Sequence, residues 1–381
     1  MANQPDSTQV TGAISRYRGG ARSPAGRPAP LALALALALA TAAMLALAGC
    51  WSPRGALPSH AQRPRTILVA SAAALVRAAR QSRPGDTVLV AAGTYRGTLA
   101  PRVSGTQAAP IVFEATPGAP VTLDAAGGAT GISVIGQHDL RFSGFTVTGA
   151  SAQGVWVARA ARVRFSRLRV TRNRAPGIQL KDATDVTVER SRVDGNLRAG
   201  IMELDGVVGG RYLHDQIVGN GHDQQPFNGD GIMLHGQGAL VAGCLLDRNG
   251  DDRLHEHGIY AASDATGYLL EGNLLRGNAG AGVKAEGAGV VRGNRFGSSR
   301  LAIAADDTSG DGLLLEGNTI AGSFQHAVIV GQHARVRLLG NAIAASPSAT
   351  PGDHAAVLVL AGAVVRMDRN RVVWGGRVLS G

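Results

Sequence analysis

Small and branched apolar residues alternate with polar turn residues in a pattern that repeats along the chain. Seven glycines each precede an isoleucine or a valine, with steps of 23, 23, 23, 31, 27 and 24 residues: Gly131, Gly154, Gly177, Gly200, Gly231, Gly258 and Gly282. A period between about 20 and 50 residues is typical of stacked repeats, because a single repeat cannot bury its own apolar face. The pattern therefore predicts a solenoid built from similar coils.

Asparagine recurs in phase with these glycines. One series lies in the turns: Asn173, Asn196, Asn220, Asn249 and Asn278. A second series lies within Leu/Val-rich segments: Asn273, Asn294, Asn318, Asn341 and Asn370. Asparagine at a repeated turn position suits both a left-handed backbone conformation and a ladder of side-chain hydrogen bonds. We expect both features at these positions.

The segments between the turns predict strands. Thr187–Glu189, Leu269–Glu271 and Val336–Leu338 are short, rich in branched residues and bounded by Gly, Asn or Asp. After about residue 85, no segment keeps a helical period long enough for a helix. Coils of roughly 23 residues, stacked about 4.8 Å apart, would form parallel sheets around an apolar core. We predict an all-β fold, a right-handed parallel β-helix with three strands per coil; the competing leucine-rich repeat lacks its LxxLxLxxN pattern.

The residues before the repeats predict a cap for one end of the solenoid. Ser71 to Gln81 form an Ala-rich amphipathic segment, in which Leu75 and Ala79 share one face. A short helix there would cover the strand edges that the first coil otherwise exposes. We expect a single β-helix domain over residues 66–381, with the cap and the first coils in residues 66–130.

The N-terminal region resembles an export signal. Arginines precede an apolar segment, Leu31–Leu47, and the sequence Leu-Ala-Gly-Cys50 follows it. This end resembles the lipobox of bacterial lipoproteins, which implies a lipid on Cys50, a membrane contact through that lipid and an extracytoplasmic location. Residues 1–49 would then be a disordered region plus a lipoprotein signal peptide, and residues 50–65 a linker. A transmembrane anchor and a secreted protein are the alternatives. The other cysteine, Cys244, is expected in the core without a disulfide.

The charge of the chain favours an anionic partner. The formal charge is +11, and it falls to +8 without residues 1–49 because these hold four Arg and one Asp. A uronate polysaccharide, a phosphate-rich envelope polymer and a nucleic acid would all fit this charge. The arginines are scattered, however, and there is no recognition helix or aromatic-rich RNA motif. We therefore expect an acidic polysaccharide as partner, no nucleic acid, and a monomer.

Ionisable residues gather in residues 214–286, where the coils lengthen. If the branched residue after each glycine points inward, alternation places Tyr260 and Lys284 outward in one column, about 5 Å apart along the axis. The residue before each glycine forms a neighbouring column, so Asp230 and His257 should lie side by side. Two further residues of this region are candidates for substrate binding: His235 and Glu286.

The start of the predicted domain resembles that of many secreted β-helix polysaccharide lyases. A strand and a helix are followed by Pro84-Gly85-Asp86-Thr87-Val88 and then by Gly93-Thr94-Tyr95. This resemblance implies a fold and no particular substrate.

Three later segments resemble family 9 pectate lyases: Asn228–Ile232, Gly243–Asp252 and Gly280–Lys284. In that family an aspartate and an Asp-Asp pair one coil later hold calcium, and a lysine after a Gly-apolar step is the base. The resemblance implies a base at Lys284 and calcium ligands at Asp230, Asp251 and Asp252.

An insertion separates this chain from the family pattern. The segment Arg253–His257 places Glu256 and His257 where the family has its Asp pair, which makes Glu256 a further candidate ligand. A mixed His and carboxylate set would also suit zinc or manganese. The aspartate spacing resembles the acid trio of polygalacturonases as well, but their histidine and Arg-x-Lys signature is not matched.

These residues fit β-elimination from a uronate. Neutralising the carboxylate beside C5 stabilises the negative charge that develops as the C5 proton leaves. Lys284 would take this proton, and His257 or Tyr260 would protonate the leaving oxygen. We expect a polysaccharide lyase. The alternatives are a non-catalytic glycan-binding scaffold, a glycoside hydrolase, and a C5-epimerase that uses Tyr260 and His257 as its acid/base pair.

Overall fold

The computed structural model describes residues 63–222, 229–251, 255–306, 308, 312–347 and 354–379. The chain divides between Ala61 and Gln62, and all described residues belong to the second unit. The predicted signal peptide, Cys50 and most of the predicted linker therefore lie outside the described residues. Among the residues that are described, no helix is long and apolar enough to cross a membrane.

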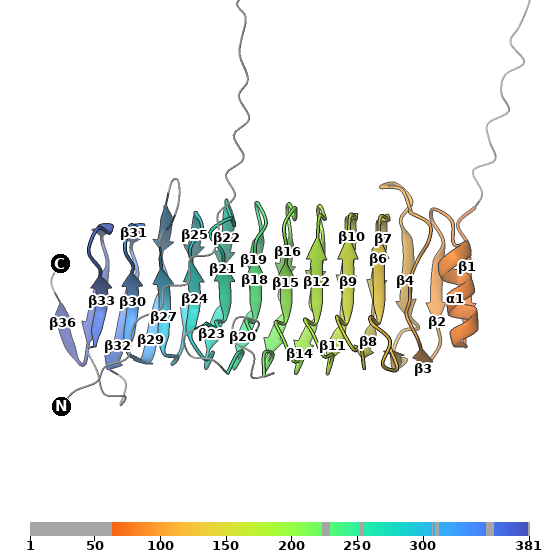
Figure 1. Cartoon of the computed structure of the whole chain (residues 1–381), viewed down its shortest axis with the longest axis horizontal. Helices are drawn as coiled ribbons and strands as arrows, with labels where there is room; N and C mark the ends of the chain where they lie inside the picture. Colours follow the sequence, from red (N-terminus) through yellow and green to blue (C-terminus); the bar gives the residue numbers. More distant parts are fainter. Residues whose placement is uncertain are drawn as a thin grey trace, which may run out of the picture. The chain divides into compact units, whose positions relative to one another are not determined.

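The strands stack in three sheets, which we name A, B and C in the order in which each coil passes through them (Figure 1). Sheet A contains β1 (Thr66–Val69), β2 (Thr87–Val90), β4 (Ile111–Ala115), β7 (His138–Ser143), β10 (Ala161–Ser166), β13 (Thr187–Glu189), β16 (Arg211–Leu213), β19 (Leu240–Ala242), β22 (Tyr268–Glu271), β25 (Gly289–Arg292), β28 (Leu313–Glu316), β31 (Arg335–Leu339) and β34 (Val364–Asp368). Sheet B contains β3 (Gly93–Arg96), β5 (Val121–Asp124), β8 (Phe145–Thr148), β11 (Arg169–Thr171), β14 (Arg192–Asp194), β17 (Gln216–Val218), β20 (Leu245–Asp247), β23 (Leu274–Arg276), β26 (Arg295–Phe296), β29 (Thr319–Phe324), β32 (Ala342–Pro347), β35 (Arg371–Trp374) and β36 (Arg377–Leu379). Sheet C contains β6 (Ile132–Ile135), β9 (Val155–Ala158), β12 (Ile178–Lys181), β15 (Ile201–Glu203), β18 (Ile232–Leu234), β21 (Ile259–Ala261), β24 (Ala281–Ala285), β27 (Leu301–Ala305), β30 (His326–Val330) and β33 (Ala355–Val359).

The described residues form a parallel β-solenoid of about 11 turns, which confirms the predicted fold. Strands of successive coils pair in parallel, and the antiparallel pair of β35 with β36 ends sheet B. The strands expected at Thr187–Glu189, Leu269–Glu271 and Val336–Leu338 are β13 and parts of β22 and β31.

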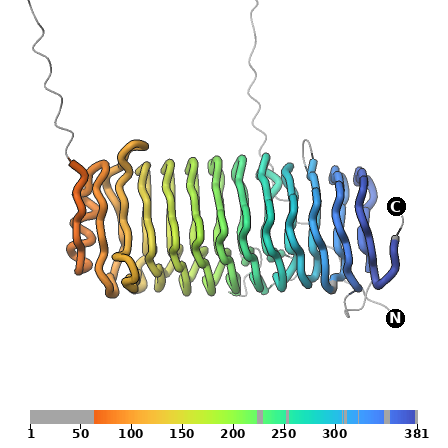
Figure 2. Tube along the Cα trace, turned by 180° about the vertical axis from the view of Figure 1, so that it is seen from behind, coloured from red at the N-terminus to blue at the C-terminus, as the bar shows by residue number. Residues whose placement is uncertain are grey.

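The predicted capping helix is α1 (Ala72–Gln81), at the N-terminal end of the stack in Figure 2. The Ser71 hydroxyl accepts the Ala74 N–H at 3.2 Å, which satisfies one of the free amides of the first turn. Leu75 and Ala79 are both buried, as their shared face predicted. The helix therefore buries its apolar side against the first coil.

The repeated glycines allow the coils to pack closely. Ile178 and Ile201 pair in register and are fully buried in sheet C. A Cβ atom at Gly177 would lie 2.6 Å from Val193 Cγ1 and 2.8 Å from the Gly200 carbonyl oxygen. Such distances are too short for a side chain, so this position needs glycine to let sheet C meet the turn after sheet B.

Both asparagine series form ladders of side-chain hydrogen bonds along the stack, as predicted. Asn196 Nδ2 donates to Asn220 Oδ1 at 2.9 Å, between sheets B and C. Asn294 Nδ2 donates to Asn318 Oδ1 at 3.1 Å and to the Leu270 carbonyl at 2.8 Å, between sheets A and B. The side chains thus satisfy backbone groups at buried corners, where water cannot.

The predicted left-handed conformation of these asparagines is wrong. Among the described residues, no asparagine has a positive φ, whereas the residue before each ladder position does: Arg172, Gly195, Gly219, Arg248, Gly277, Gly272, Gly293, Gly317, Gly340 and Arg369. The preceding residue makes the tight turn. The asparagine then keeps an ordinary backbone and directs its amide inward to the ladder.

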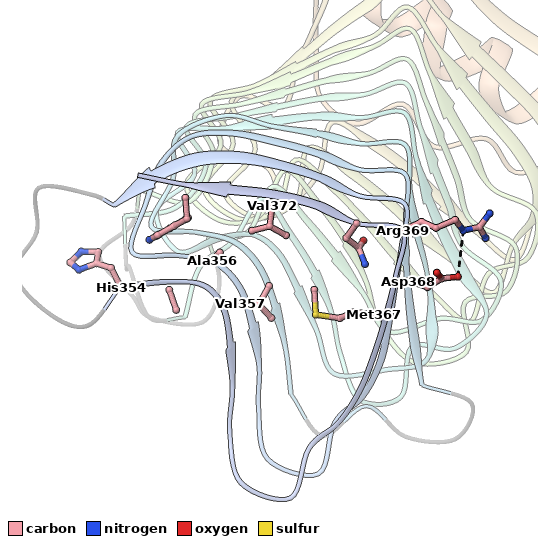
Figure 3. Close-up of a pocket in the computed structure, with 10 residues that line it drawn as sticks. His354, Ala356, Val357, Met367, Asp368, Arg369 and Val372 are labelled. Atoms are coloured by element: carbon pink, nitrogen blue, oxygen red, sulfur yellow. Dashed lines mark ion pairs between the residues drawn. The ribbon is translucent and has the colours of Figure 1, made fainter. Parts of the chain in front are cut away.

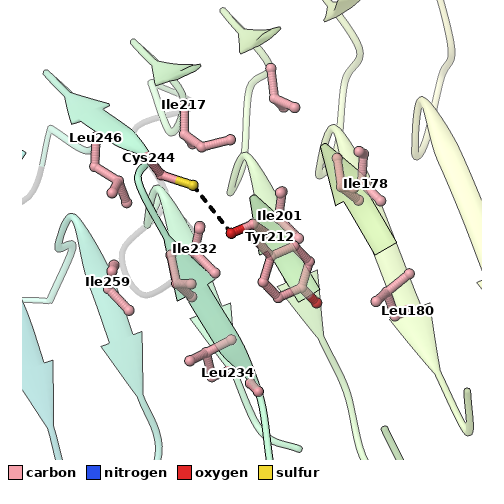
Figure 4. Packing of buried hydrophobic residues seen from close by; sticks show 14 of the residues in the cluster. Ile178, Leu180, Ile201, Tyr212, Ile217, Ile232, Leu234, Cys244, Leu246 and Ile259 are labelled. Atoms are coloured by element: carbon pink, nitrogen blue, oxygen red, sulfur yellow. Dashed lines mark hydrogen bonds between the residues drawn. The ribbon is translucent and has the colours of Figure 1, made fainter. Parts of the chain in front are cut away.

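The buried thiol of Cys244 lies in the apolar core, as Figure 4 shows. Cys244 is a free cysteine, 2% exposed, and its Sγ lies 3.3 Å from the Tyr212 carbonyl oxygen. Burial raises the pKa of this thiol to about 12, so it stays protonated. The prediction of a core cysteine without a disulfide is confirmed.

Candidate functional site

Sheet C carries the predicted outward column. Tyr260 of β21 pairs with Lys284 of β24, and Met233 of β18 pairs with Tyr260. The inward neighbours Ile259 and Val283 are fully buried. The predicted register of Tyr260 and Lys284 on adjacent coils is therefore confirmed, although the two residues are 24 positions apart.

Lys284 lies between two carboxylates. Its side chain is 16% exposed and forms an ion pair with Asp306, which follows β27 one coil further on. Nζ also lies 3.6 Å from Glu286 Oε1. The amine is thus held at a fixed place on the outward face, with groups that stabilise a positive charge on it.

Tyr260 is joined to the same carboxylate. Its hydroxyl donates to Glu286 Oε2 at 2.8 Å. The pKa of Tyr260 is raised well above its usual value, mainly by burial and in second place by the hydrogen bond to Glu286. The phenol therefore keeps its proton at neutral pH and can act as a proton donor. Glu286 contacts both Tyr260 and Lys284 in this structure, and its predicted role in substrate binding stays a prediction.

Asp230 and His257 lie side by side, as the register predicted. The backbone N–H of His257 donates to Asp230 Oδ1 at 2.7 Å. Burial raises the pKa of Asp230 well above its usual range, and the charge of Glu256 adds to this effect. A carboxyl held in this way is a structural contact between coils.

The ring of His257 is positioned by the backbone. The Ala281 N–H donates to His257 Nδ1 at 3.0 Å, which places the proton of the neutral ring on Nε2. The centroids of the His257 and Tyr260 rings are 6.1 Å apart. Because Nδ1 accepts an amide proton, the ring suits hydrogen-bond donation through Nε2 better than general acid catalysis, which would need both nitrogens protonated.

The carboxylates predicted to bind calcium are engaged with the backbone. Glu256 is fully buried, and its Oε2 accepts the Asp251 N–H at 2.7 Å. Asp251 itself is exposed. Asp252 lies outside the described residues. In Asp230 and in Glu256, one carboxylate oxygen therefore accepts a hydrogen bond from a backbone amide. Calcium binding by this set stays a prediction.

Another set of side chains converges beside Tyr260. In the described part of the chain, the ligand atoms of Asp205, His235 and Asp264 all lie within 4.8 Å of one another. His235 Nδ1 lies 2.9 Å from Asp264 Oδ1, and the His235 ring meets the Tyr260 ring edge-on at 6.5 Å. His235 was predicted to bind substrate; the structure places it between two carboxylates that the sequence analysis did not select.

Three residues of this face were missed by the sequence analysis: Asp205, Asp264 and Asp306. Asp205 and Asp264 lie 30 and 29 residues from His235, about one long coil on either side. Counting one coil length along the sequence, as was done to pair Asp230 with His257, would have found them. They were overlooked because they lie in turns, where aspartate usually satisfies backbone amides.

A family of known proteins matches part of the chain. The family described as Pel9A-like, right-handed β-helix region, matches residues 58–254, which is just over half of the chain. The chain belongs to this Pel9A-like family. The match ends before Glu256, Tyr260 and Lys284, so it covers Asp230 but not the outward column of β21 and β24. No curated protein matches the chain in sequence.

Solved structures share the Pel9A-like fold at low sequence identity. An alginate lyase from Paenibacillus sp. str. FPU-7 is 18% identical, with a TM-score of 0.57 over 79% of this chain and 99% of that one. The pectate lyase Pel9A is 16% identical, with a TM-score of 0.50 over 80% and 79% of the two chains. A GH136 lacto-N-biosidase from Eubacterium ramulus is 11% identical, with a TM-score of 0.60 over 81% and 67%. The fold is thus common to polysaccharide lyases and a glycoside hydrolase.

A pocket at the C-terminal end of this Pel9A-like chain lies away from the outward column. Figure 3 shows Val357 and Met367 lining it, with the ion pair of Asp368 and Arg369 at one side. The pocket exists because β33 and β34 are the last strands of sheets C and A, so their inward side chains have no further coil to pack against. We attribute it to the end of the stack rather than to catalysis.

Two buried carboxyl groups lie on the inner side of the coils that carry the site. Glu203 accepts the Tyr212 hydroxyl at 2.7 Å and the Gly236 N–H at 3.1 Å, and burial raises its pKa to about 7. Burial likewise raises the pKa of Asp215 to about 7. Both groups hold protons in the folded protein that an unfolded carboxyl releases near pH 4.

We therefore expect the Pel9A-like domain to be less stable at pH 8 than at pH 5. Glu203 and Asp215 contribute fully to the free energy of unfolding below about pH 4, where both carboxyls are protonated in the folded and the unfolded protein. This contribution is lost as the pH rises through about 7, because the unfolded state releases protons that the folded state retains. Thermal midpoints measured from pH 5 to pH 8 test this, with Glu203→Gln as the matched variant. The variant should show a flatter decline. Parallel curves for the two proteins would contradict the assignment to Glu203.

Proposed function

We propose that this protein is an extracytoplasmic, lipid-anchored lyase that cleaves an acidic, uronate-containing polysaccharide by β-elimination. The observation that carries the proposal is the register of Tyr260 with Lys284 on the outward face of sheet C, linked through Glu286. β-elimination needs a proton acceptor and a proton donor on the same substrate, and these two side chains supply both. An alginate lyase and a pectate lyase among the structural neighbours support this substrate class.

Lys284 is the proposed base. Lys284 is paired with Asp306 and Glu286 as a cation in this structure, so it acts as the base only after its amine has released a proton to solvent. The neutral Nζ then takes the C5 proton of the uronate, and Asp306 and Glu286 stabilise the positive charge that it regains. A substrate carboxylate would compete with these two groups for the amine. The electron pair of the broken C5–H bond forms the C4–C5 double bond, and the C4–O bond breaks.

Tyr260 is the proposed acid. Its raised pKa keeps the hydroxyl protonated, and the proton now donated to Glu286 can move to the departing O4 oxygen. His257 is better suited to orient the sugar, because its Nδ1 already accepts the Ala281 N–H. The proposal therefore assigns the donor role to Tyr260 alone.

A cation belongs to the proposal, and Asp205, His235 and Asp264 are the described residues that fit one. Two carboxylates and an imidazole offer oxygen and nitrogen ligands, a set that suits zinc or manganese as well as calcium. When bound, the cation would neutralise a uronate carboxylate beside Tyr260. Binding of calcium, manganese and zinc by calorimetry, with Asp264→Asn as the control variant, tests this part separately.

The direct test of function is incubation of the purified protein with a panel of uronate polymers, following the ultraviolet absorbance of the unsaturated product. We expect product from at least one polymer. Absence of product from alginate, polygalacturonate and glucuronate polymers alike would contradict the lyase. Deuterium incorporation at C5 without a double bond would indicate the epimerase instead.

The Tyr260→Phe variant should lose kcat with little change in KM. Removing the hydroxyl removes the proton donor, which is worth about 10²–10⁴-fold in rate, while the ring that contacts substrate remains. Steady-state rates on the preferred polymer measure the effect. Tyr95→Phe is the control, since the Tyr95 hydroxyl donates to the Ala91 carbonyl in the N-terminal cap. A Tyr260→Phe enzyme with an unchanged rate would remove Tyr260 from the mechanism.

A further inference from the structure

Long side chains occupy the corner between sheets A and B in three consecutive coils. Arg167, Arg190 and His214 occupy it with φ values of 51°, 47° and 57°, a backbone region that L residues rarely adopt. The flanking coils place Gly144 and Gly243 at the same corner, with φ values of 79° and 64°. Arginine has a positive φ at other corners too, as at Arg172 and Arg248, but there the next coil has a glycine, Gly195 and Gly277. Only here among the corners described do long side chains follow one another in three consecutive coils, so that their polar ends form one row.

These corner residues line a groove that runs across four coils. The groove measures about 450 Å³ and continues onto the first outward positions of sheet B, where Arg169 pairs with Arg192 and Arg192 with Gln216. It lies at the junction of sheets A and B, whereas Tyr260 and Lys284 project from sheet C. The groove and the candidate active site are therefore on different faces of the solenoid.

The groove is positively charged. Four arginines line it, and Asp194 is shared between Arg169 at 3.1 Å and Arg192 at 3.3 Å. The buried Asp215 accepts the backbone N–H of Ser191 at 2.7 Å behind the groove, and burial raises the pKa of this carboxyl to about 7. Arg167 donates to the Ser143 hydroxyl at 2.9 Å. Within the described residues, neither Arg167 nor Arg190 makes an ion pair with a carboxylate. Two guanidinium groups on adjacent coils are thus available to an anionic ligand.

We propose that this groove binds an acidic polysaccharide chain lying along the solenoid axis, apart from the site on sheet C. Guanidinium groups bind carboxylates through paired hydrogen bonds, and the coil spacing repeats such donors about every 4.8 Å. The aromatic residue of the lining, Phe145, is 1% exposed and offers no surface on which a nucleic acid base could stack. Arginine with Thr146 and Gln216 suits carboxylate and hydroxyl groups of a sugar. The identity of the polymer rests on the proposed function.

The variant Arg167→Gly/Arg190→Gly tests the groove without disturbing the fold, because glycine is the residue of the neighbouring corners. Arg248→Gly is the matched control: Arg248 also has a positive φ, of 54°, and is 72% exposed, but it lies at the corner between sheets B and C. Affinity for immobilised alginate and polygalacturonate is measured for each protein in low and high salt, with dextran as the neutral polymer. We expect the double variant to bind at least about tenfold more weakly and to melt no lower than the wild type. Arg248→Gly should bind like the wild type.

The outcomes separate this inference from the lyase. Undiminished binding by the double variant, or no binding of uronate polymers by the wild type, would refute polysaccharide binding in the groove, whatever the catalytic result. Binding of single-stranded DNA in preference to both polyuronates would overturn its assignment to a polysaccharide. Arginine-dependent binding without any unsaturated product would leave the groove in place and refute the lyase. On a uronate trisaccharide, the double variant should keep the wild-type rate.

Discussion

Replacing Lys284 by alanine is expected to reduce formation of unsaturated product by at least about 10³-fold. The proposed base would be absent, and general base catalysis contributes about 10²–10⁴-fold to rates. Asp306 and Glu286 would also lose their ion-pair partner and repel the carboxylate of the substrate. The effect should appear in kcat and in kcat/KM, measured by the absorbance of the product.

The chain offers a matched control for this prediction. Lys181, the other of the two lysines, also lies on sheet C, at the end of β12, and is exposed. Lys181→Ala should keep the wild-type rate and stability. Equal losses in both variants, or full activity of Lys284→Ala, would show that Lys284 is not the base. Thermal unfolding of each variant separates a catalytic effect from a folding defect.

The Asn294→Ala variant is expected to lower the free energy of unfolding by about 3–5 kcal/mol. Asn294 Oδ1 accepts both the backbone N–H and the side-chain amide of Asn273 at 2.9 Å, and its own Nδ2 donates to Leu270 and Asn318. Each buried group that loses its partner costs about 1–3 kcal/mol, because water cannot replace the bond. Urea unfolding followed by circular dichroism measures the loss.

Asn370→Ala is the control within the same ladder. Asn370 accepts from Asn341 and donates to the Leu338 carbonyl, but it lies at the partly buried end of the ladder, where water can replace lost partners. Its replacement should cost clearly less than that of Asn294. Equal costs at the two positions would mean that the ladder does not stabilise the solenoid through buried hydrogen bonds.

The sequence predicts most of this fold because its period sets both the coil and the register. Once Ile232, Ile259 and Val283 are aligned, the outward positions of Tyr260 and Lys284 follow from the alternation of a strand. The same arithmetic placed Asp230 beside His257. Strands and columns were therefore predictable without any knowledge of side-chain contacts.

Turns were less predictable, because their backbone is not fixed by a two-residue period. The left-handed residue of each corner precedes the ladder asparagine, and arginine or glycine occupies it, as at Arg172 and Gly195. The partners of Lys284 and His235, Asp306 and Asp264, follow strands and reach their contacts only through turn geometry. The role of Glu286 also depends on a side-chain conformation that the pattern does not specify.

The most direct measurement is a crystal structure of the Lys284→Ala variant with a bound uronate oligosaccharide. The account predicts that the sugar lies across β21 and β24 on the outward face of sheet C, with C5 of one uronate facing residue 284. The Tyr260 hydroxyl should lie within hydrogen-bond reach of the scissile oxygen. An oligosaccharide bound only elsewhere, or one with C5 turned away from residue 284 and out of reach of Tyr260, would contradict the proposed active site.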